Sequence, residues 1–180
     1  GGVEYQSMKL LSWILIFYYV GFHTLAMVFF LPFITTNHHY NDEMKSYGFS
    51  PTWWGFFTPQ SVFNDLGYTL TPNSMIPFQQ NAYIAIVSSF FIVIGNTGFP
   101  VFLRLIIWIL HKFSKPLTMF RDSLTFLLLH PRRCFTLLFP SGPTWWLFTV
   151  LLILNLIDWI LFIILDFNSK ELSSLPKGYR

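Results

Sequence analysis

The sequence predicts an all-α membrane protein, and three observations lead to that prediction. The chain of 180 residues is 53% hydrophobic and only 11% charged, which leaves too few polar side chains to cover a soluble domain. Its apolar residues gather in three runs, 10–34, 82–110 and 145–165. Each run reaches the ~20 residues that cross the hydrocarbon core of a bilayer, about 30 Å thick. We therefore expect three transmembrane helices.

The first run, 10–34, carries no formal charge and reads as a continuous span. His23 lies within it, and we interpret this histidine as a neutral packing residue. The following residues, 35–50, are polar and turn-rich, which predicts an external loop. His38 and His39 have no cysteine or carboxylate at metal-ligand spacing and are expected to be solvated there.

A second apolar stretch, "TWWGFFTPQSVF" in 52–63, is too short to span a bilayer. Ser50-Pro51 is a plausible helix start, with a capping serine before a proline in the first turn. Thr58-Pro59 offers a second start. The length predicts a re-entrant or interfacial helix.

The polar stretch 61–75, "SVFNDLGYTLTPNSM", then connects this short helix to the second run. Irregular backbone at membrane depth is tolerated where it is buried in protein or lines a water-filled path. A return segment turning at Gly67 could line a pore with carbonyl oxygens, and the C-terminal end of the short helix would favour a cation. Alternatively, residues 52–81 form a surface loop with their tryptophans in the aromatic belt. The residues alone leave both interpretations open.

The second run, 82–110, is interrupted by "GNTGFP". The interruption holds Gly95, Asn96, Gly98 and Pro100, and a proline there predicts a kink. The break is either a packing bend or a gating element. Arg104, lower in the same run, would either snorkel to headgroups or pair with carbonyls, or else face the permeation path.

Residues 113–144 are expected to form a basic linker, since between the second and third runs Lys112, Lys115, Arg121, Arg132 and Arg133 oppose Asp122 alone. Excess Lys and Arg marks the cytoplasmic side, so we expect the N-terminus and residues 112–144 inside. Cys134, the one cysteine, would then be an inert cytoplasmic thiol.

The third run holds Asp158, an intramembrane carboxylate that either relays ions or hydrogen-bonds an adjacent helix. No nucleophile–base pair, phosphate-binding loop or zinc pattern is apparent, so we predict no enzyme and no cofactor. Because the chain begins without methionine and stops just beyond a span, we expect a fragment of a longer protein.

Three stretches, "SVFNDLGYTLTPNSM", "GNTGFPVFLRLIIWIL" and "HPRRCFTLLFPSGPTWWLF", resemble the fungal Trk-type potassium transporters. These belong to the superfamily of bacterial TrkH and KtrB and plant HKT proteins. The resemblance implies four covalently linked repeats, each a helix, a pore loop and a helix, around one pore. Residues 1–112 would be one repeat with its pore loop at 52–78, and 145–180 the first helix of the next repeat and the start of its external loop.

The resemblance also implies site residues. Backbone carbonyls of the selectivity filter would come from Asn64, Asp65, Leu66 and Gly67, supported by Ser61, Phe63 and Tyr68. Asp65 stands where many relatives have asparagine, and it either faces the pore or braces the loop; we favour bracing. Gating or pore-tuning residues would be Gly95, Asn96, Gly98, Pro100 and Arg104.

The implied function is potassium uptake across the plasma membrane, this chain supplying one quarter of the pore. Its partners would be K⁺, with Na⁺ or Rb⁺ as competing ions, the remaining repeats, the lipid bilayer and a second copy of the parent, but no nucleic acid. A non-transporting scaffold or accessory subunit is the alternative, and a third is a single-repeat subunit that tetramerises.

Overall fold

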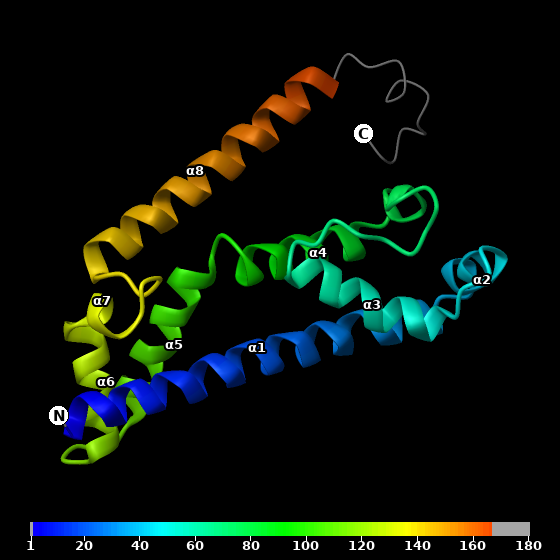
Figure 1. Cartoon of the computed structure of the whole chain (residues 1–180). Coiled ribbons are helices and arrows are strands. Elements are labelled where there is room, and N and C mark those ends of the chain that lie inside the picture. Colours follow the sequence, from blue (N-terminus) through cyan, green and yellow to red (C-terminus); the bar gives the residue numbers. More distant parts are fainter. Residues whose placement is uncertain (1, 167–180) are drawn as a thin grey trace. The chain divides into compact units, whose positions relative to one another are not determined.

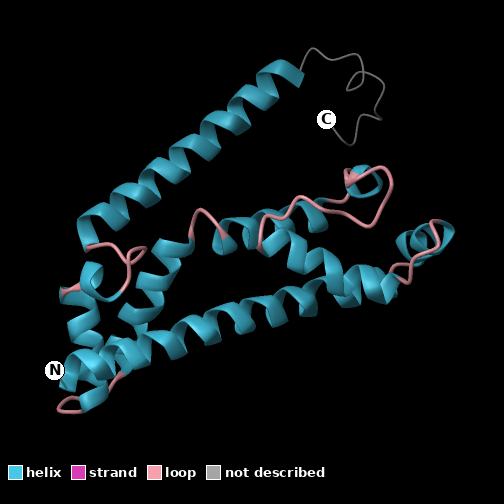
Figure 2. Ribbon diagram, in the orientation of Figure 1, coloured by secondary structure: helices cyan, strands magenta, loops and turns pink. Residues whose placement is uncertain are grey.

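Residues 2–166 are described by the structure, a computed structural model, and every regular element among them is a helix (Figure 2), which confirms the all-α prediction. In chain order the elements are α1 (Gly2–Thr36), α2 (His38–Ser46), α3 (Pro51–Phe63), η1 (Ile76–Phe78), α4 (Ala82–Gly95), α5 (Phe99–Phe113), α6 (Met119–Leu129), α7 (Pro131–Cys134) and α8 (Ser141–Asp166). The chain divides into two compact units, Gly1–Pro140 and Ser141–Arg180, which are described separately.

The first unit is organised along α1, the long blue helix of Figure 1. Its 35 residues give a length of about 52 Å at 1.5 Å per residue, more than the hydrocarbon core requires. The helix extends beyond the predicted 10–34 at both ends and continues through Pro32. It therefore offers a surface long enough for both α3 and α6 to pack against it.

Two helices have the length and apolarity to cross a membrane, α1 and the Ser141–Leu161 part of α8. The pair α4 and α5 also passes that test jointly, but the two helices are bent by 78° at the break between them. The described residues thus hold two candidate spans, or three if the bent pair is one span. The predicted kink at "GNTGFP" is confirmed.

The segment after α1 was predicted to be a loop, and that prediction is wrong for residues 38–46, which form α2. A tertiary contact explains the helix: Met44 is fully buried, and the Tyr40 ring stacks on Phe78 with centroids 5.0 Å apart. His38 and His39 are exposed, as expected, but they lie in this helix.

The short helix α3 begins at Pro51, as predicted, although the Ser50 side chain makes no capping hydrogen bond. The alternative start at Pro59 is wrong, because the helix continues through that residue to Phe63. Close packing places α3 against α1: a β-carbon on Gly55 would lie 3.1–3.2 Å from atoms of Leu31 and Ile34.

Two apolar clusters hold the first unit together. The larger joins α1, α3 and α4, with η1 and α2 against it, and is formed by Tyr18, Ala26, Phe30, Ile34, Met44, Trp54, Phe63, Phe78, Ile84, Phe91 and Ile94. The smaller joins α1, α5 and α6 with the segment before α8, and is formed by Leu11, Ile14, Leu103, Ile107, Leu124, Leu127 and Leu138. The segment predicted as a linker is therefore packed: α6 lies against α1 and α5.

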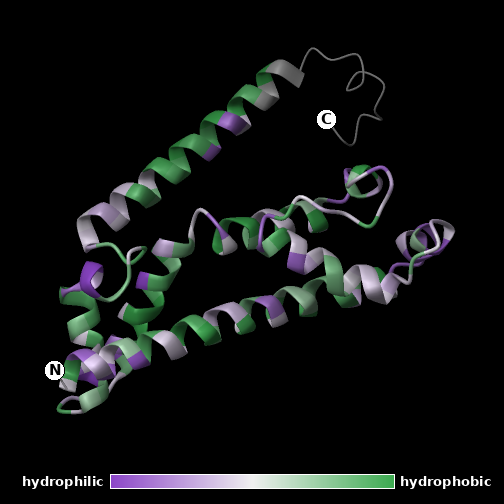
Figure 3. Cartoon of the chain, in the orientation of Figure 1, coloured by the Kyte–Doolittle hydropathy of each residue, from purple (hydrophilic) through white to green (hydrophobic). Residues whose placement is uncertain are grey.

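The second unit is α8, which begins at Ser141 rather than at the predicted 145. Most of it is apolar, with a less hydrophobic beginning and a few hydrophilic positions along its length (Figure 3). The predicted start of an external loop falls in 167–180, outside the described residues. The repeat boundaries inferred from the resemblance stay predictions.

Candidate pore loop

The candidate pore loop begins where α3 ends, in a Schellman motif. Asp65 has a positive φ of 51°, the Leu66 N–H donates to the Ser61 carbonyl at 3.0 Å, and the Asp65 N–H to the Val62 carbonyl at 3.4 Å. This hydrogen-bond pattern ends helices at a left-handed residue, where glycine or asparagine is usual. Asp65 tolerates the conformation better than most side chains do. The carbonyls of Ser61 and Val62 accept these two hydrogen bonds, so they are not free to face a cation at the end of α3.

A second constraint closes the loop. The Ser61 hydroxyl donates to the Tyr68 carbonyl at 2.6 Å, so one side chain ties the last turn of α3 to the far side of the turn. Between them Gly67 has a φ of 70°, which favours glycine. A β-carbon there would meet no atom within 4 Å. The backbone at Gly67 is thus open to approach.

Exposure divides the predicted site residues into two groups. Ser61 and Phe63 are buried at the end of α3. Asn64, Asp65, Leu66, Gly67 and Tyr68 are exposed. The structure therefore joins a buried support to an exposed backbone stretch within one short segment.

Asp65 is held by a hydrogen bond from the break between α4 and α5. Its carboxylate accepts a hydrogen bond from the Asn96 side-chain amide at 2.9 Å, across the turn between α4 and α5. This is the contact that the bracing interpretation requires, and it brings two predicted site residues together.

Gly95 permits that approach. A β-carbon at this position would lie 1.9 Å from the carbonyl oxygen of Phe63, far inside contact distance. A glycine is therefore needed where the end of α4 passes the end of α3. The loop and the helix break are packed backbone to backbone.

At the break between α4 and α5, a side chain of α1 supplies a hydrogen bond that the helix itself does not make. The Gly98 N–H bonds the Val93 carbonyl at 2.6 Å rather than the Ile94 carbonyl, and the buried Tyr18 hydroxyl donates to Ile94 at 2.7 Å. Buried carbonyls need such partners. Pro100, which lacks an N–H, lies buried in the first turn of α5.

His23 is the site residue that the sequence did not identify. It is 5% exposed, as a packing residue should be, but its Nε2 also lies 2.8 Å from the Asn64 side-chain nitrogen. A polar side chain inside an apolar helix was the available signal. Its partner, 41 residues away, was not deducible.

Two predicted residues lie elsewhere. Arg104 donates to the Phe139 carbonyl at 2.6 Å, which is the carbonyl pairing that one interpretation expected. Asp158 is exposed on α8, in the second unit. Within the described part of the first unit, Arg104 makes no hydrogen bond to the pore loop.

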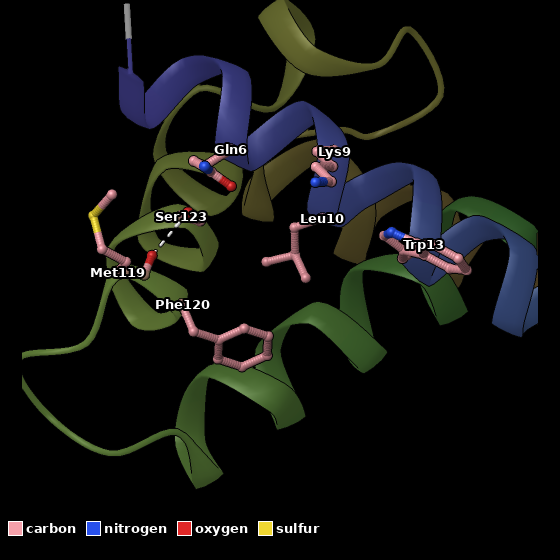
Figure 4. A pocket seen from close by; sticks show the side chains of 7 residues that line it. All are labelled: Gln6, Lys9, Leu10, Trp13, Met119, Phe120 and Ser123. Carbon is pink, nitrogen blue, oxygen red and sulfur yellow. Dashed lines mark hydrogen bonds between the residues drawn. The ribbon is translucent and has the colours of Figure 1, made fainter.

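An open pocket is found away from the loop. A pocket of about 290 Å³ lies between the first turns of α1 and α6, where the Lys9, Leu10 and Trp13 side chains come from α1 and Met119, Phe120 and Ser123 from α6 (Figure 4). In residues 2–166 no group of three or more His, Cys, Asp or Glu is placed to hold a metal.

Outside the spans, Cys134 lies at the end of α7 and is half-buried. Burial raises the pKa of its thiol above the ordinary value, and the nearby Glu4 carboxylate raises it further. The thiol is therefore held in its less reactive, protonated form.

Comparison with known proteins gives consistent matches. The family model described as "TrkH: Cation transport protein" matches residues 1–180. The chain is 59% identical over all of its length to a low-affinity and to a high-affinity potassium transport protein of Saccharomyces cerevisiae, covering 20% and 15% of them. It is 46% identical to potassium transport protein 1 of Schizosaccharomyces pombe, covering 21%. The chain thus spans about a fifth or less of these relatives.

Proposed function

The chain belongs to the TrkH family of cation transport proteins, and from that premise we propose that it supplies one quarter of a pore for potassium uptake. The remaining quarters would come from the rest of a longer parent chain. The relatives that it matches are named potassium transport proteins and are several times longer. K⁺ is the proposed permeating ion, with Na⁺ and Rb⁺ as competitors.

The observation that carries the proposal is the exposed backbone of Asn64–Gly67, whose position is restrained by side-chain hydrogen bonds. Carbonyl dipoles can replace the hydration shell of an alkali cation if their positions are fixed. Three side-chain hydrogen bonds restrain this stretch: Ser61 to Tyr68, Asn96 to Asp65, and Asn64 to His23. The bracing of Asp65 by Asn96 supports a role for its carboxylate behind the filter.

The driving force would be the membrane potential. Moving one charge inward through 100 mV, inside negative, yields about 2.3 kcal/mol. The basic segment 112–144 supports a cytoplasmic location for that end of the unit. The pore loop would then lie in the outer half of a plasma membrane. No chemical cofactor is needed for such passive movement.

The competing function is a scaffold in which 52–81 lies flat on the membrane surface. Close packing of α3 on α1 at Gly55 supports the pore-loop arrangement instead, because it directs the short helix along a candidate span. The end of α3 then meets the break in α4–α5, where irregular backbone needs protein cover.

Substitution of Gly67 tests the proposal in the full-length parent, expressed in a host that lacks its own potassium uptake. Gly67→Arg should abolish Rb⁺ uptake and growth at low K⁺, since it adds a bulky cation to the exposed backbone. Gly48→Arg is the matched control: Gly48 also has a positive φ, of 81°, and open surroundings. Uptake unchanged by Gly67→Arg, at equal surface level, would remove the transport function of this segment.

A further inference from the structure

His23 is held in one orientation on α1. Its ring packs against two aromatic rings, with centroids 4.1 Å from Tyr19 and 4.3 Å from Phe63, and the side chain is 5% exposed. Its Nδ1 lies 2.8 Å from the Tyr19 carbonyl oxygen. Because a carbonyl only accepts, Nδ1 carries a hydrogen; because the Asn64 amide nitrogen only donates, Nε2 is the acceptor of that contact.

That acceptor meets Asn64. The Asn64 side-chain nitrogen lies 2.8 Å from His23 Nε2 and 2.8 Å from the Gln60 carbonyl oxygen. Both partners accept, so both hydrogens of the amide are used and the side chain has one orientation. Asn64 is also the residue at which α3 ends and the exposed stretch begins.

We infer that His23 is a positioning residue for the ion pathway: through Asn64 it sets where the first carbonyl of the pore loop lies. The inference rests on the proposed function, since a position has no consequence if no ion passes. Ser61 and Asn96 hold the other parts of the loop. His23, on α1, contacts Asn64, the first residue of the loop.

A positioning role and a packing role predict different results. Lost packing lowers the amount of folded protein at the surface and leaves each remaining molecule selective. Lost positioning leaves the loop able to relax around smaller ions, because discrimination between alkali cations depends on the field that the carbonyls present. The ratio of Rb⁺ to Na⁺ uptake per surface molecule therefore separates the two roles.

The experiment compares three variants of the full-length parent with the wild type. His23→Leu removes the acceptor and should lower the Rb⁺:Na⁺ ratio by roughly three- to tenfold, the equivalent of one hydrogen bond. His23→Gln keeps an acceptor oxygen near the place of Nε2 and should restore most of the ratio. His111→Leu is the matched control: His111 bonds Thr125 across α5 and α6 at 3.1 Å, and its loss should leave the ratio unchanged.

Two further measurements keep the result decisive. If His23→Leu fails to reach the surface, His23→Met, which is unbranched and favours helices, replaces it. Asn64→Ala removes the bonds to both His23 and the Gln60 carbonyl and should lower the ratio at least as much. Adding His23→Leu to it should change little further, because the bond between the two side chains is already lost. Equal ratios for His23→Leu and wild type, or additive effects in the double variant, overturn the inference. A wild-type parent without Rb⁺ uptake would instead overturn the proposed function.

Discussion

The Asp65 carboxylate accepts a hydrogen bond from the Asn96 side-chain amide at 2.9 Å, joining the end of α3 to the break between α4 and α5. The two residues are 31 positions apart. Their contact connects the exposed backbone stretch to the point where the second apolar run bends by 78°. The loop and the bend are therefore parts of one structure.

Exchange of these two side chains should be tolerated, whereas one change alone should not. Asn96→Asp places two carboxylates together and loses a hydrogen bond, so we expect Rb⁺ uptake to fall by roughly three- to tenfold. Asp65→Asn together with Asn96→Asp rebuilds the pair in reverse and should recover uptake. Asparagine also accepts the positive φ at position 65. A double variant no better than Asn96→Asp would show that the pair does not brace the loop.

Gly95→Ala adds only one methyl group but should clearly lower the free energy of unfolding. The added carbon would lie 1.9 Å from the Phe63 carbonyl oxygen, a backbone atom, so α3 and α4 must move apart. Overpacking of this kind costs about 1–3 kcal/mol. Thermal unfolding of the detergent-purified parent would show it as a lower Tm. Gly21→Ala on α1, with no atom within 4 Å of the new carbon, is the control and should leave Tm unchanged or raise it.

Tyr18→Phe should also destabilise the end of α4, through the loss of a contact with α1. It deletes the hydroxyl that bonds the Ile94 carbonyl at 2.7 Å, leaving a buried acceptor without its donor. The expected cost is about 1–3 kcal/mol, measured again by Tm. Tyr19→Phe, on the same helix with a half-exposed ring, should have little effect. Equal Tm values for the two variants would mean that the Ile94 carbonyl finds another donor.

Cys134 should be alkylated slowly at neutral pH. Its thiol pKa lies above the ordinary value, so the thiolate fraction is small near pH 7 and grows only as pH rises through the elevated pKa. Maleimide labelling of a parent whose other cysteines are replaced by serine would measure the rate. Glu4→Gln should speed the reaction, because the carboxylate contributes to the shift. A labelling rate already at its plateau at pH 7 would contradict the raised pKa.

The sequence predicted those features that depend on local chemistry. Pro100 with its neighbouring glycines predicted the break, Pro51 was one of two predicted starts of α3, and Gly67 predicted a turn. Helix α2 was missed because its stability comes from burial of Met44 and stacking of Tyr40, which are contacts with distant segments. His23 was interpreted as packing alone for the same reason, since no local pattern reports a partner 41 residues away. Long-range pairing was the information that the sequence lacked.

Among the residues that the structure describes, every side-chain hydrogen bond made by residues 61–68 joins positions between 23 and 96. The contacts that fix the conformation of this loop are therefore contained in a single stretch of the chain. A copy of this segment made by gene duplication would bring along every one of these contacts and would need no new partner to keep the shape of residues 61–68.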